Sequence, residues 1–219
     1  MLLMVIMHAM VQLENAWGLR MWVLHWSWYP WLHLIFSGSF IFIAGICCNF
    51  TKSNLRRGCL ALGCAMAITA VSFLPVMYGA PIYFGVLHCL GTMMVIYGLF
   101  ENTAAKIIWH PVTLPVWLIL FAICFSWYQT APDGSWLTLI VGMPPAIFMG
   151  DYYPLIPYLP LFFAGAAVGK PIADGHFPTW FYDARLPFLS GVGKNALIVY
   201  IAHLPVVYLL LLIFFGWPK

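Results

Sequence analysis

The sequence predicts an all-α fold, a bundle of helices that crosses a membrane several times. Of the 219 residues, 64% are hydrophobic and 7% are charged, whereas a soluble domain typically has about 45–50% apolar and about 25% charged residues. The apolar residues form continuous runs and do not alternate with polar ones as they would in a membrane β-barrel. A soluble globular domain is therefore excluded, and the nine scattered Lys and Arg residues make no nucleic-acid-binding face. We expect one compact transmembrane domain over residues 1–219.

The apolar positions suffice for about seven spans at about 20 residues each. Trp136–Met149 is also apolar, but Pro144 and Pro145 interrupt it, so it is a re-entrant segment, a packed loop or an eighth span. The first run is short, because its helix would rise about 18 Å against an apolar core of about 30 Å. We therefore expect a truncated first span, in a natural chain that begins upstream of Met1. The seven runs, in order, are Leu2–Leu13, Leu32–Phe50, Gly58–Tyr78, Tyr83–Phe100, Pro111–Tyr128, Pro154–Gly169 and Ala196–Trp217.

Positive charges in the loops predict the orientation of the chain. Seven of the nine Lys and Arg residues lie in three alternate loops. Cytoplasmic loops carry an excess of such residues, so we expect these loops and the N-terminus to be cytoplasmic and the Asn15–Trp31 connection to lie outside. The seven are Lys52, Arg56 and Arg57 after the second run, Lys106 after the fourth, and Lys170, Arg185 and Lys194 before the last.

The outer connection Asn15–Trp31 is rich in tryptophan. This composition is typical of an aromatic belt at the membrane interface, and it also suits an amphipathic lid over a site. The two interpretations are compatible. The residues concerned are Trp17, Trp22, Trp26, Trp28 and Trp31.

Two histidines within the spans are candidates for function, because ionisable groups inside a membrane are costly. Helical spacing places Gln12 and Asn15 on the same face as His8, so this polar stripe should face the bundle interior. His203 lies near mid-depth of the last span, one turn after Tyr200. The alternative for both histidines is a structural hydrogen bond that holds helices together.

The outer side offers one further histidine and one carboxylate. His25 can act as a general base toward an amine or hydroxyl, because its ordinary pKa is near neutral. Asp151 opens the sixth span on the same side and could orient His25 or a substrate amine, or it could simply be a charge favoured at a helix N-terminus. We find no hydrolase, P-loop or metal-binding signature and expect no metal. The six cysteines all lie in or beside apolar runs, where a free cysteine behaves as a small hydrophobe.

Five strings, in order along nearly the whole chain, resemble motifs of the heparan-alpha-glucosaminide N-acetyltransferase catalytic-domain family. The resemblance is to the short bacterial branch of these integral-membrane acyltransferases. The family's acidic residue and Arg-Gly pair before the first helix are missing here. The strings are LLMVIMHA, FIFIAGICCNFTKSNLRRG, IYFGVLHCLG, DYYPLIPYLPLFFAGAAVGK and GVGKNALIVYIAHLP.

The resemblance implies an enzyme that moves acetyl from cytoplasmic acetyl-CoA to an amino- or hydroxy-sugar on the outer side of a bacterial inner membrane. The family's essential histidine stands in a His-x-Ser-Trp context, which His25 matches. His8 would position the acetyl donor or share the proton transfer. The expected partners are the lipid bilayer and a glycan or amino-sugar acceptor, without nucleic acid, and a homodimer is left open. The residues expected to contact acetyl-CoA are Lys52, Arg56, Arg57 and His203.

Two other functions remain as alternatives from different classes. A transporter or flippase for a small polar or lipid-linked solute could use His8, Gln12 and His203 along its path, although we see no internal repeat of the kind such proteins have. A structural membrane subunit would use the same histidines only for packing. Binding of CoA supports the enzyme, and solute flux without CoA supports the transporter.

Overall fold

The computed structural model describes residues 2–73, 81–101, 110–147, 151–183, 191 and 193–217. Within these ranges the chain is helical, with turns and loops between the helices and no strand. It divides into two compact units, one made of Met1–Ser37 with Thr179–Lys219 and one made of Gly38–Pro178. The helices and 3₁₀ turns are α1 Leu2–Trp17, η1 Trp22–His25, α2 Tyr29–Cys47, η2 Cys48–Phe50, α3 Asn54–Ser72, α4 Val86–Phe100, η3 Pro111–Thr113, α6 Leu114–Thr130, α7 Leu155–Ala173, α8 Thr179–Asp183 and α10 Ala196–Phe215.

Each of the seven expected runs contains a helix, which confirms the all-α membrane fold. Among the described residues, five helical stretches are long and apolar enough to cross a membrane. The helix α4 is shorter, and its 15 residues rise about 22 Å. The five stretches are Tyr29–Phe50, Asn54–Ser72, Pro111–Thr130, Leu155–Ala173 and Ala196–Phe215.

The proline-interrupted segment does not form a helix in its described part, residues 136–147. It is a packed sequence of turns, in which the Thr138 hydroxyl donates to the Met143 carbonyl over 2.8 Å. The buried Leu139 anchors it, since its carbonyl accepts from the Tyr152 hydroxyl. Of the readings that the sequence left open, an eighth helical span finds no support in residues 136–147. Residues 148 and 149, and residues 74–78 of the third run, lie outside the described ranges.

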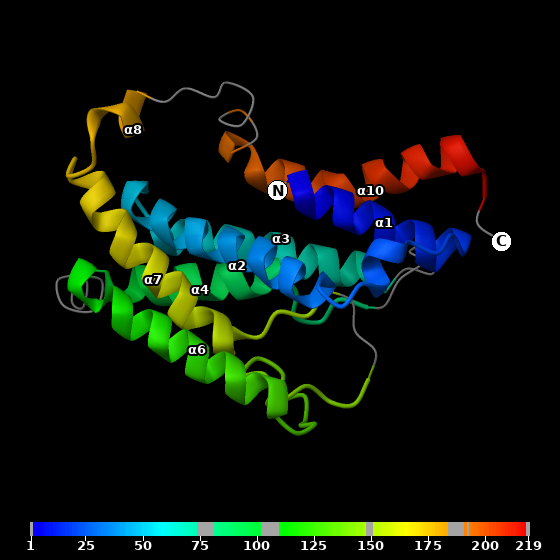
Figure 1. Cartoon of the computed structure of the whole chain (residues 1–219), viewed down its shortest axis with the longest axis horizontal. Helices are drawn as coiled ribbons and strands as arrows, with labels where there is room; N and C mark the ends of the chain where they lie inside the picture. Colours follow the sequence, from blue (N-terminus) through cyan, green and yellow to red (C-terminus); the bar gives the residue numbers. More distant parts are fainter. Residues whose placement is uncertain are drawn as a thin grey trace. The chain divides into compact units, whose positions relative to one another are not determined.

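Glycines allow the helices of the second unit to pack at very short distance. A Cβ atom at Gly91 of α4 would lie 2.8 Å from the Leu62 side chain of α3. A Cβ at Gly165 of α7 would overlap the carbonyl oxygen of Phe42 in α2. Small residues at such crossings are typical of membrane helix pairs, where close backbone approach replaces the hydrophobic effect. Figure 1 shows α3 beside α4 and α6 beside α7.

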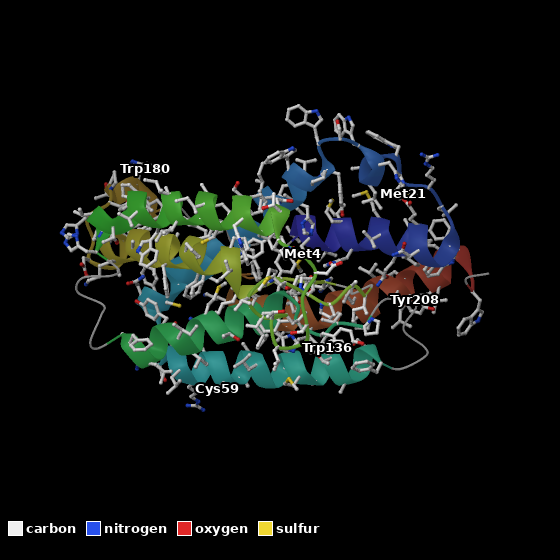
Figure 2. All side chains as sticks on the ribbon, turned by 90° about the horizontal axis from the view of Figure 1, so that it is seen from below. Met4, Met21, Cys59, Trp136, Trp180 and Tyr208 are labelled. Carbon is white, nitrogen blue, oxygen red and sulfur yellow. The ribbon has the colours of Figure 1, made fainter. Side chains whose placement is uncertain are left out.

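In the first unit, α1 and α10 run side by side (Figure 1). The indole Nε1 of Trp17 donates to the Gly216 carbonyl over 3.0 Å. The Trp17 ring also lies 5.6 Å from the Tyr208 ring, centroid to centroid. Together these contacts join the end of the first helix to the end of the last helix, and Figure 2 marks Tyr208 on α10.

Candidate functional site

His25 is hydrogen-bonded to Glu14, the acidic residue near the end of α1. The distance from His25 Nε2 to Glu14 Oε1 is 2.6 Å. The second carboxylate oxygen of Glu14 accepts the backbone amide of Met21 over 3.0 Å. The side chain of His25 is 47% exposed and that of Glu14 is 25% exposed. The pair is therefore well defined in geometry and also open to an incoming molecule.

A sharp turn after α1 creates this pair. Gly18 ends the helix with a φ of +68°, a left-handed conformation that favours glycine. The amides of Gly18 and Leu19 donate back to the carbonyls of Glu14 and Leu13 over 3.1 and 3.2 Å. The chain then reverses and forms the 3₁₀ turn Trp22–His25. The reversal brings the last residue of that turn against the carboxylate of Glu14.

The chemistry of the pair follows from its protonation. Glu14 lies beyond the apolar run Leu2–Leu13, and the Met21 amide, followed by His25, holds the pKa of its carboxyl below the ordinary value of 4.5. An ionised carboxylate can only accept, so it accepts the Nε2–H of His25. Neutral His25 then carries its lone pair on Nδ1. A carboxylate that fixes the tautomer of an imidazole and stabilises its charged form is the usual arrangement of a histidine base.

The two intramembrane histidines named from the sequence meet in the first unit. His8 Nδ1 lies 3.0 Å from His203 Nε2, and the ring centroids are 5.0 Å apart. His203 is 5% exposed, and its Nδ1 donates to the Tyr200 carbonyl. Because a carbonyl only accepts, neutral His203 must accept on Nε2 from His8 Nδ1–H.

Gln12 shares the face of His8, as the helical spacing indicates. Its Oε1 atom is buried and has no hydrogen-bond partner among the described residues. A buried acceptor without a donor is costly, at about 1–3 kcal/mol. The stripe therefore combines a satisfied histidine pair with an amide oxygen that can still accept a hydrogen bond.

Asp151 lies in the second unit, where it contacts the start of α4. Its Oδ2 accepts the Val86 amide over 3.3 Å, and a Cβ at Gly85 would lie 2.7 Å from the same oxygen. Asp151 therefore lies at the N-terminus of α4, where a carboxylate is favoured. It does not cap the sixth span, as one of the two readings of the sequence expected, because the helix of that span, α7, begins at Leu155. Its expected role toward His25 or a substrate amine stays a prediction.

His88, one turn into α4, belongs to a closed hydrogen-bond network. Its Nδ1 accepts the Gly85 amide over 3.3 Å, and its Nε2 lies 3.2 Å from Thr69 Oγ1. The Thr69 hydroxyl in turn donates to the Ile82 carbonyl over 2.8 Å. Each proton has an acceptor in this arrangement, so His88 joins α3 to α4 as a structural histidine.

The basic loop after α2 presents three cations that form no ion pair with a carboxylate among the described residues. Lys52 and Arg56 are exposed, and Arg57 is half-buried, with Nη1 2.5 Å from Thr51 Oγ1. The Ser53 side chain caps α3 by accepting the Arg56 amide over 3.3 Å. The buried Asn54 donates to the Cys48 carbonyl and to Glu101, each over 2.9 Å. None of these bonds pairs Lys52, Arg56 or Arg57 with a carboxylate, so their positive charges are available to an anion.

Glu14 is the residue that the sequence did not single out. An acid at the end of a helix resembles an ordinary solvent-exposed charge. Two features could have marked it: the Gly18 that follows, which favours a chain reversal, and its position before a loop that contains His25. Of the other named cations, Lys106 and Arg185 lie outside the described residues.

The described helices define an integral membrane protein that carries a histidine–carboxylate pair beside its first long span. The chain matches the family model for the catalytic domain of heparan-alpha-glucosaminide N-acetyltransferase over residues 1–205, and it belongs to this family. The resemblance drawn from the five strings is confirmed. Membership implies a membrane acetyltransferase type of function. No curated protein and no solved structure matches the chain.

Proposed function

We propose that the protein transfers an acetyl group from cytoplasmic acetyl-CoA to an amine or hydroxyl of a sugar on the outer side of a bacterial inner membrane. The observation that carries this proposal is the Glu14–His25 pair, 2.6 Å apart, in a chain of this family. The pair supplies an accessible base held by an anion, and acyl transfer to an amine or hydroxyl needs such a base.

The reaction balances with these two residues and the two substrates. Nδ1 of His25 removes a proton from the acceptor as its nitrogen or oxygen attacks the thioester carbonyl carbon. The tetrahedral intermediate collapses, the carbon–sulfur bond breaks, and the CoA thiolate takes the proton from the imidazolium. Glu14 stabilises the imidazolium between these steps. An acetyl-histidine intermediate is the second route to the same products.

The donor is proposed to bind by its charged end at the basic loop. The 3′-phospho-ADP part of CoA carries several negative charges, and Lys52, Arg56 and Arg57 are cations without a carboxylate partner among the described residues. Gln12 Oε1 and the His8–His203 pair are the buried polar groups proposed to contact the uncharged arm and the acyl group. An amide N–H of that arm would satisfy the buried Gln12 acceptor.

The cytoplasmic N-terminus also belongs to the proposal. It is supported by the three positively charged loops, which fall on one side when the runs alternate. The same arrangement puts the Glu14–His25 pair opposite the basic loop, so the acyl group has to cross the membrane to meet the acceptor.

The test is transfer of labelled acetyl from acetyl-CoA to a panel of amino sugars in proteoliposomes. His25→Ala should lower the rate by a factor on the order of 10²–10⁴. His176→Ala is the matched control, because His176 is also an exposed histidine and should keep the wild-type rate. An unchanged rate in His25→Ala would remove this residue from the mechanism. Solute flux without CoA, together with no acetyl transfer, would favour the transporter instead.

A further inference from the structure

Exposed indole rings flank His25 in the sequence. Trp22, Trp26 and Trp28, which we call the indole loop, surround His25 in sequence, and their exposed fractions are 71%, 51% and 64%. The Trp22 and Trp26 rings contact each other, with centroids 5.9 Å apart. Figure 2 shows ring side chains that project away from the segment marked by Met21. These rings thus present large apolar surface on the segment that carries the half-exposed His25.

The indole loop continues into the lipid-facing side of a membrane helix. The helix α2 belongs to the stretch Tyr29–Phe50, which is long and apolar enough to span a membrane. Trp31 in its first turn is 59% exposed, and Ile35, one turn further on the same face, is 58% exposed. Since the exposed face of such a helix contacts lipid chains, Trp31 marks the level at which α2 enters the apolar core.

Few charges accompany this loop: Arg20 precedes it, and the carboxylate of Glu14 contacts His25. Residues 21–35 contain no Asp, Glu, Lys or Arg, and their titratable side chains other than Tyr29 are His25 and His33. Indole rings prefer the headgroup layer, where the ring is desolvated and its N–H finds a polar partner. An exposed apolar patch of this kind marks a membrane interaction site. His25 is therefore held at the depth of the lipid headgroups.

We infer that the acceptor is itself anchored in the membrane: an amphipathic molecule whose headgroup carries the amine or hydroxyl and whose apolar part lies in the bilayer. This inference rests on the proposed acyl transfer and names its acceptor class. Such a headgroup is confined to the layer that contains Nδ1 of His25, whereas a soluble sugar has to enter that layer from water. Confinement raises the effective concentration at the base, by factors that reach about 10²–10⁴ in linked systems.

The experiment compares two acceptors with the same reacting group in the same proteoliposomes. One is methyl glucosaminide, which is soluble, and the other is glucosamine linked to a dialkylglycerol in the bilayer. We expect kcat/KM for acetyl transfer to be on the order of 10²-fold higher for the lipid-linked sugar. Replacing Trp22 and Trp28 together by Gln should move this ratio toward one, through KM of the lipid-linked acceptor. Trp180→Gln is the control, because Trp180 is 70% exposed but lies on α8.

The outcomes distinguish the inference about the acceptor from the proposed acyl transfer. A higher rate with methyl glucosaminide would overturn the inference and leave the proposed acyl transfer intact. No transfer by wild type to either acceptor would instead overturn the proposed function. An equal loss for both acceptors in the Gln variant would mean that the indole rings bind the sugar directly, which also contradicts the inference. Because the Gln variant could fail to fold, Trp22→Tyr with Trp28→Tyr is the second variant. Tyrosine also prefers the membrane interface, so this variant should keep the higher kcat/KM for the lipid-linked sugar.

Discussion

Replacement of Glu14 by Gln tests whether the carboxylate acts through His25. Glutamine keeps the size of the side chain and an oxygen that can still accept from His25 Nε2, but it removes the negative charge. In enzymes with a buried triad, the corresponding change lowers kcat by about 10⁴. Here the two side chains are 25% and 47% exposed, so water screens their interaction. We therefore expect a smaller loss, about tenfold to 10²-fold in kcat, with KM for acetyl-CoA unchanged.

The assay is steady-state acetyl transfer, measured over a range of pH for wild type and for Glu14→Gln. Glu14→Asp is the informative partner, because it keeps the charge and shortens the reach to His25 and Met21. It should retain more activity than Glu14→Gln if charge dominates, and less if the position of the imidazole dominates. Wild-type activity in both variants would refute the role of Glu14. A loss confined to protein yield would show that Glu14 only shapes the turn after α1.

Four further predictions concern other parts of the molecule. Gly165→Ala should destabilise the second unit by about 1–3 kcal/mol or more, because the new Cβ would overlap the Phe42 carbonyl. Gly63→Ala in α3 is the control, because its Cβ meets nothing within 4 Å. Thermal unfolding in detergent compares the stability of the two variants. Replacing Lys52, Arg56 and Arg57 by Gln should raise KM for acetyl-CoA about tenfold or more and make this KM less dependent on salt concentration. Lys170→Gln is the control, since Lys170 already pairs with Asp174 over 2.9 Å. His203→Ala should cost about 1–3 kcal/mol of unfolding free energy, because it removes the partner of His8 and the bond to Tyr200; His203→Gln should recover part of it. The turn at Glu14 should stay ordered as the pH falls to 4.5, the ordinary pKa of the carboxyl, and should be lost at lower pH. The reason is that the folded protein holds the pKa of Glu14 below 4.5, so protonation at lower pH removes the stability that the carboxylate contributes. Limited proteolysis of residues 18–28 measures this loss.

Hydropathy predicted most of the fold, because the length of each apolar run indicates whether its helix can cross the apolar core of a membrane. The runs of α2, α3, α6, α7 and α10 became the long helices. The proline pair correctly marked Trp136–Met149 as an exception, because two adjacent prolines remove backbone donors that a helix needs. The packed turns found there depend on Thr138 and Leu139, whose contacts are tertiary and leave no periodic signal in the sequence.

The candidate site was predictable only in part. The predicted polar stripe holds only in part, because His8 contacts the buried His203 whereas Asn15 is exposed. His203 lies 195 residues away from His8, and no local pattern announces that they meet. Glu14 was missed for the same physical reason: its contact with His25 requires the reversal at Gly18, which is decided by tertiary packing as well as by the glycine. His25 was singled out by the resemblance, because it stands in the His-x-Ser-Trp context of the family's essential histidine; from the residues alone it was one of several candidate histidines.

In the proposed reaction acetyl crosses the bilayer, from a donor on one side to an acceptor at His25 on the other. Sealed proteoliposomes with the lipid-linked glucosamine confined to one leaflet, and labelled acetyl-CoA added to one side, test this directly. We expect labelled product when donor and acceptor face opposite sides, and we expect His25→Ala to abolish it while His176→Ala does not. Product that forms only when both substrates face the same side, or at the same rate in His25→Ala, would contradict it.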